Sequence, residues 1–76
     1  MSERAPAGAQ LEITVNGAAR QVRPGSTVAE LILAMGRSPQ GIAVSVNLAV
    51  VSRSRWASTP LHEGDHVEVL AAAQGG

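Results

Sequence analysis

Residues 11–36 have the sequence LEITVNGAARQVRPGSTVAELILAMG, which predicts a hairpin followed by a helix. Residues 11–15 alternate apolar and polar side chains with a period of two, as a half-buried strand does. Asn16-Gly17 is the strongest short hairpin signal, because both residue types tolerate positive φ angles. We therefore expect a second strand over Ala18–Arg23, with Arg20 facing outward.

A helix is expected after a turn at Pro24-Gly25. Thr27 and Glu30 have the spacing of a capping box, in which each side chain binds the backbone N–H of the other residue. Apolar side chains then recur at i, i+3, i+4 and i+7, which places one stripe on a helix of about two turns. The members of this stripe are Val28, Leu31, Ile32 and Met35. Gly36 suits the position just after the helix.

The second half of the chain predicts three more strands. Ile42–Asn47 is the best of them, with Ile42, Val44 and Val46 on one face, and Val50–Ser52 is a short companion. The turn between them, Asn47-Leu48-Ala49, requires a positive φ more easily reached by Gly than by Leu.

The final strand is expected over His66–Ala71, with Val67, Val69 and Ala71 inward and His66, Glu68 and Leu70 outward. Before it we expect an irregular segment over Arg53–Leu61 and a tight turn over residues 62–65. Trp56 is expected to pack over one edge of a core that has no other aromatic side chain.

The order strand, strand, helix, strand, short strand, strand satisfies the two-layer rule. It predicts an α+β protein with a ubiquitin-like β-grasp fold, in which one main helix packs on a four- or five-stranded mixed sheet. We expect a flexible leader over residues 1–10, the β-grasp domain over 11–71 and a flexible tail over 72–76.

Composition excludes several function classes. The chain has 76 residues, enough for one small domain, and a net charge of zero, with no basic excess for nucleic acid. No apolar run is long enough to span a membrane. Cysteine is absent, which excludes disulfides and thiol catalysis and favours a cytoplasmic location. With two His and six acidic residues, an active site of its own is not expected. His62 and His66 lie across a turn without a third ligand, so no metal site is expected.

The tail Gln74-Gly75-Gly76 suggests a chemical role. A carboxylate on Gly76, with an ordinary pKa of about 3.3–3.7, is a poor electrophile until ATP converts it to an acyl-adenylate. A sulfur nucleophile could then displace AMP and leave a thiocarboxylate. Glycine lacks Cβ and can thread a narrow cleft, and residues 72–76 could extend roughly 17 Å. The alternative is an inert end.

Several stretches resemble the ThiS family of thiamine-biosynthesis sulfur carriers. They are GSTVAEL (25–31), Ile42–Asn47 with Val50-Val51, the Arg53-x-x-Trp56 spacing, TPLHEGDHVEV (59–69) and the Gly-Gly end. The similarity covers residues 11–76. One departure is Leu48, since family members often have Asn-Gly at that turn.

The resemblance implies that Gly76 is the modified glycine and Gly75 its partner. An E1-like, ThiF-type adenylyltransferase would consume ATP to adenylate Gly76, a cysteine desulfurase would supply sulfur, and the thiocarboxylate would serve a ThiG-type thiazole synthase. The protein would then be a carrier without a bound cofactor, not an enzyme.

Partner contacts and three further functions stay open from the residues alone. Glu68 and Leu70 on the last strand, and Arg53 and Arg55, are candidate interface residues, with solvated surface as the alternative. The small subunit of molybdopterin synthase shares the fold and tail expected here. A ubiquitin-like protein modifier and a non-catalytic interaction module are also compatible with these residues.

Overall fold

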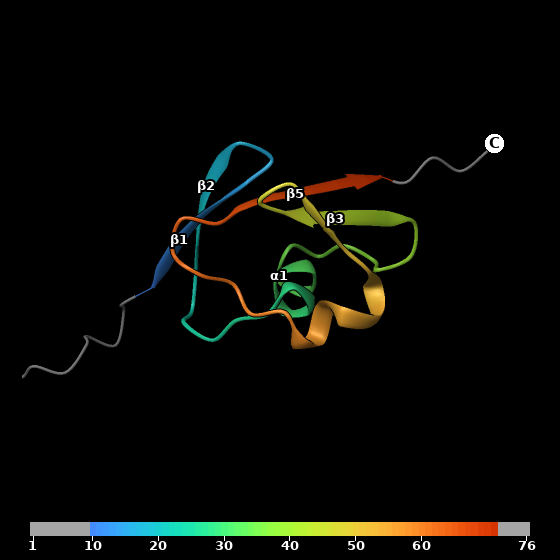
Figure 1. The fold of residues 1–76 in the computed structure, drawn as a ribbon, viewed down its shortest axis with the longest axis horizontal. Coiled ribbons are helices and arrows are strands. Elements are labelled where there is room, and N and C mark those ends of the chain that lie inside the picture. Colours follow the sequence, from blue (N-terminus) through green and yellow to red (C-terminus); the bar gives the residue numbers. More distant parts are fainter. Residues whose placement is uncertain (1–9, 72–76) are drawn as a thin grey trace, which may run out of the picture.

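The computed structural model describes residues 10–71, in which one main helix packs against one face of a five-stranded mixed sheet (Figure 1). The strands lie in the order β2-β1-β5-β3-β4, with β5 parallel to β1 and antiparallel to β3. The predicted β-grasp architecture is confirmed. The elements are β1 (Leu11–Val15), β2 (Ala18–Val22), α1 (Val28–Ala34), β3 (Ile42–Val46), β4 (Ala49–Val51), the 3₁₀ helix η1 (Arg53–Ser58) and β5 (His66–Ala71).

The first hairpin forms around the predicted two-residue turn. Asn16 and Gly17 have φ angles of 52° and 84°, as a type I′ turn requires. This turn pairs Val15 with Ala18, and the register then places Arg20 opposite Ile13. Ile13 is buried in the core, so the prediction that Arg20 faces outward is wrong. The turn sets which face each β2 residue occupies, and it overrides the polarity of the side chain.

Helix α1 begins and ends as predicted. The Thr27 hydroxyl accepts from the Glu30 N–H, and the Glu30 carboxylate accepts from the Thr27 N–H, which completes the capping box. After the helix, Gly36 has a φ of 73°, and its N–H donates to the Leu33 carbonyl. The Arg37 N–H donates to the Ile32 carbonyl, so the helix ends in a Schellman motif.

The core lies between α1 and the inner face of the sheet. It consists of Ile13, Val15, Val28, Leu31, Ile32, Val44, Trp56, Leu61, Val67 and Val69. The predicted inward side chains of β5 are therefore buried except for Ala71, which is exposed at the end of the strand. No helix within residues 10–71 is long and apolar enough to cross a membrane.

Two expectations for the segment after β3 need correction. The part of the chain expected to be irregular contains the 3₁₀ helix η1. A helix this short has no repeating apolar pattern in the sequence. The short strand is Ala49–Val51 rather than Val50–Ser52, because the turn before it uses only Asn47 and Leu48. Trp56 packs in the core as predicted, and its Nε1–H donates to the Val51 carbonyl at 2.9 Å.

Two asparagine side chains connect the hairpin turns to β5. The Asn16 carboxamide donates to the Val69 carbonyl at 3.1 Å and accepts from the Val69 N–H at 2.8 Å. The Asn47 carboxamide accepts from the His66 N–H at 2.9 Å and donates to the Asp65 carboxylate at 2.9 Å. Both turns are thereby attached to the strand that precedes residues 72–76.

Replacement of Asn16 by Gly tests the first of these connections. Glycine keeps the positive φ of the turn but removes both hydrogen bonds to Val69, so we expect the free energy of unfolding to fall by about 1–3 kcal/mol. Urea denaturation would measure it. Ser38→Ala is the control, because within residues 10–71 the Ser38 hydroxyl donates only to the exposed Gln40 side chain and its loss should change stability by less than about 0.5 kcal/mol. Equal stabilities of N16G and the parent protein would contradict the role of Asn16.

Replacement of Trp56 by Phe separates ring packing from hydrogen bonding. Phe keeps an aromatic ring in the core but leaves the Val51 carbonyl without its indole donor, so we expect a loss of about 1 kcal/mol. Because Trp56 is the only Trp in the chain, its fluorescence in the parent protein also reports its environment. The emission should shift to longer wavelength on unfolding, and an emission already typical of exposed indole in the folded protein would contradict the burial.

Candidate functional site

The outer face of the sheet, opposite α1, is the first candidate surface. In Figure 1, α1 and η1 lie on the same side of the sheet, and within residues 10–71 no helix covers the other side. The register places Ala43 opposite Leu70, and Ser45 opposite both Glu68 and Val50, on this outer face. Side chains of β3, β4 and β5 therefore lie next to one another on this face.

A group of these side chains forms an exposed apolar patch with one acid in it. We call it the outer patch, and it consists of Ala43, Ser45, Leu48, Val50, Glu68 and Leu70, which line a shallow hollow of about 270 Å³. Leu48, Val50 and Leu70 are 91%, 80% and 58% exposed. Clustered apolar side chains on a small protein often mark a docking surface.

The structure brings together only part of the predicted interface. Glu68 and Leu70 both lie on the outer patch, as the strand pattern predicts. Arg53 and Arg55 are exposed, but they lie in η1, which packs beside α1 on the opposite side of the sheet. The two pairs therefore do not form one surface.

Leu48 and Val50 belong to the outer patch, although they are not among the interface residues expected from the sequence. The signal that could have identified Val50 is the two-residue turn at Asn47-Leu48, because it fixes the register of β4 and puts Val50 on the outer face. For Leu48 the signal is its side chain at a turn position that usually holds a small or polar residue.

A second hollow adjoins the outer patch near the start of β5. It has a volume of about 470 Å³, and it shares Leu48 and Glu68 with the outer patch. His66 also lines it, and the His66 Nδ1 atom lies 2.9 Å from the Thr14 hydroxyl oxygen. The two hollows therefore adjoin on one face of the sheet, which extends from the hairpin turns to Leu70.

The two histidines have different partners. His66 contacts Thr14, whereas the His62 Nδ1 atom lies 3.9 Å from the Asp65 carboxylate. Asp65 is largely buried, and it accepts hydrogen bonds from the His62 N–H and from Asn47. Over residues 10–71, no group of three or more His, Asp or Glu side chains is placed to hold a metal ion.

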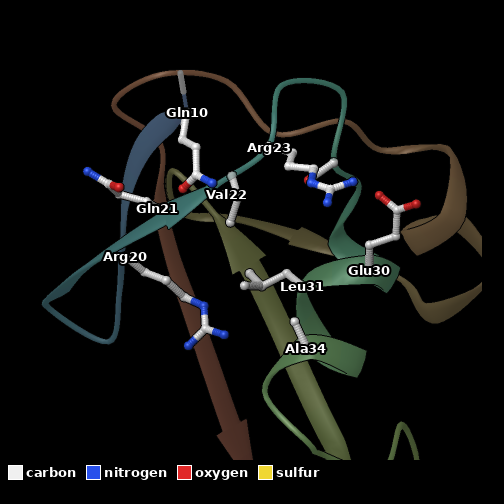
Figure 2. Close-up of a pocket in the computed structure, with 9 residues that line it drawn as sticks. Gln10, Arg20, Gln21, Val22, Arg23, Glu30, Leu31 and Ala34 are labelled. Atoms are coloured by element: carbon white, nitrogen blue, oxygen red, sulfur yellow. The ribbon is translucent and has the colours of Figure 1, made fainter. Parts of the chain in front are cut away.

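A third hollow lies on the helix side, between β2 and α1 (Figure 2). It has a volume of about 340 Å³, and its charged lining residues are Arg20, Arg23 and Glu30. Glu30 is already engaged in the capping box. This hollow is lined by no residue of β5, so it is separate from the outer patch.

Gln74, Gly75 and Gly76 lie outside the described residues, and in the sequence they follow the end of β5 after Ala72 and Ala73. The geometry therefore describes the domain that precedes the tail.

Comparison with known proteins extends to the tail itself, because the model of the ThiS family matches residues 13–76. The chain belongs to the ThiS family. The resemblance noted from the sequence is confirmed.

Individual relatives agree with this assignment. The chain is 30% identical to the sulfur carrier protein ThiS of Escherichia coli K12, over 87% of this chain and 100% of that protein. The crystal structure of the thiamine biosynthesis protein ThiS from Geobacter metallireducens is 30% identical and has a TM-score of 0.76, over 87% of this chain and 100% of that one.

Two longer relatives contain a similar segment. The thiazole synthase of Magnetococcus marinus is 35% identical over 87% of this chain, and the thiazole synthase of Paramagnetospirillum magneticum is 30% identical over the same share. The chain spans only 20% of the length of either protein. In both, a segment similar to this domain is part of a thiazole synthase chain.

Proposed function

We propose that this protein is a sulfur carrier for thiazole formation in thiamine biosynthesis. The observation that carries the proposal is the match of the ThiS family model through Gly76, on a β-grasp domain whose last strand precedes the Gly-Gly tail. The full-length match to the Escherichia coli sulfur carrier supports it. The thiazole synthase relatives support the thiamine branch over molybdopterin synthase.

The proposed chemistry takes place on the carboxylate of Gly76. A carboxylate oxygen attacks the α-phosphorus of ATP on an E1-like, ThiF-type adenylyltransferase, and pyrophosphate leaves. The terminal sulfur of a persulfide formed by a cysteine desulfurase then attacks the acyl carbon, and AMP leaves. A thiol reduces the S–S bond of the resulting acyl disulfide and is itself oxidised to a disulfide. The product is a thiocarboxylate, which delivers its sulfur to a ThiG-type thiazole synthase. Partner enzymes perform the catalysis, and this chain is their protein substrate.

The domain contributes recognition and presentation to this scheme. Its outer patch includes Glu68 and Leu70 of β5, which lie a few residues before Gly76 in the chain. A partner that binds this face therefore lies close to the start of the tail. Gly75 has no side chain, and the side chain of Gln74 is unbranched at Cβ. Both features suit passage through a narrow cleft. We place the protein in the cytoplasm, since a chain without cysteine does not depend on an oxidising compartment.

Intact-mass spectrometry tests the proposal. After incubation with ATP, the cognate adenylyltransferase and the sulfur donor, we expect the mass to increase by the difference between one sulfur and one oxygen atom. Fragmentation should locate the change at Gly76. Omission of ATP is the control and should leave the mass unchanged. A complete reaction mixture that never changes the mass would contradict the proposal.

Replacement of Gly76 by Ala tests why glycine occupies the last position. An added Cβ must enter the cleft that holds the acyl group, so we expect G76A to keep the parent melting temperature and to load sulfur at least about tenfold more slowly. The expected factor corresponds to about 1.4 kcal/mol in the barrier. Equal loading rates would contradict the steric argument, and the melting temperature serves as the control for folding.

A further inference from the structure

The turn between β3 and β4 holds a leucine in an unfavourable backbone conformation. Leu48 has a φ of 74°, next to Asn47 with a φ of 52°. Asparagine tolerates this left-handed region, but the Cβ of leucine lies too close to the following carbonyl oxygen. Type I′ turns favour Gly at this second position for that reason.

The requirements of the fold do not account for leucine at this position. The Leu48 side chain is 91% exposed, so it adds nothing to the core. The hydrogen bonds that attach the turn to β5 come from Asn47 instead. An exposed apolar side chain held in a disfavoured conformation indicates a function outside the folded domain.

Leu48 connects the two hollows of the outer face. It lines the hollow beside Val50 and Leu70, and it also lines the hollow beside His66. Glu68 likewise lines both hollows. The outer face therefore presents a projecting leucine near one acidic side chain, and a complementary partner would offer an apolar pocket beside a basic group.

The acidic residue argues against a second copy of this chain as the occupant. Two copies joined by a two-fold axis on this face would bring Glu68 close to its own equivalent, and like charges placed together are destabilising. A different protein is therefore favoured. The relatives from Magnetococcus marinus and Paramagnetospirillum magneticum carry a similar segment within a thiazole synthase, which points to that enzyme class.

We propose that Leu48 is an anchor that docks this domain on thiazole synthase, in an apolar pocket next to a basic side chain that pairs with Glu68. This inference rests on the proposed carrier function and adds the surface that it uses. It concerns the domain alone, so it applies to the protein before sulfur is loaded.

Titration calorimetry with the cognate thiazole synthase and the full, unloaded chain tests the anchor. Leu48→Asn removes the apolar side chain while keeping a residue that tolerates positive φ. We expect its affinity to fall at least about tenfold and its melting temperature to stay equal or rise. Leu48→Met keeps the apolar bulk and should bind within about threefold of the parent protein.

Leu33→Ala is the matched control. Leu33 is 71% exposed on α1, on the opposite side of the sheet, and its truncation should leave the affinity unchanged. Unchanged affinity of L48N, or a lower melting temperature of L48N, would overturn the proposal, because either result removes the evidence for an anchor at a strained position.

Three further measurements separate the remaining occupants and the carrier function. A slower rate of adenylation of L48N, with unchanged affinity for thiazole synthase, would assign the anchor to the adenylyltransferase and overturn our choice. A parent dimer in sedimentation that L48N abolishes would assign it to a second copy, with the same consequence. Sulfur loading is measured independently by mass. If the protein cannot be loaded but its binding to thiazole synthase still depends on Leu48, the carrier function is refuted and the anchor is supported.

Discussion

The attachment of β5 to both hairpins is the constraint on which the rest of the structure depends. This strand lies in the centre of the sheet, between β1 and β3, although it comes last in the chain. The carboxamides of Asn16 and Asn47 bind the backbone of β5 from either side. Asn47 binds β5 at its first residue and Asn16 binds it at Val69, and pairing with β3 continues to Ala71.

The parts of the fold that could be predicted are those whose contacts join residues close together in the sequence. The first hairpin, the capping box of Thr27 and Glu30, and the end of α1 at Gly36 follow from signals within a few residues, and all three are confirmed. The parallel pairing of β1 with β5 joins Thr14 to His66. No local pattern specifies that contact, because the two residues are 52 positions apart in the chain.

The candidate site could be predicted only in part for the same reason. Glu68 and Leu70 follow from the alternation along one strand. Their neighbours Leu48 and Val50 come from the hairpin of β3 and β4, and only the registers of β3 with β4 and with β5 reveal that they adjoin. Arg53 and Arg55 have suitable chemistry but belong to η1 on the helix side, so residue type alone does not place a side chain on a shared surface. The tail remains a prediction from its sequence and its family match.

The two edges of the sheet bear on how such a carrier behaves at high abundance. β4 has only three residues, and β2 points the charge of Arg20 toward the inner face. Short strands and inward charges both hinder the addition of a strand from another molecule. Sheet edges that reject one another therefore allow many copies of the domain to coexist without joining edge to edge.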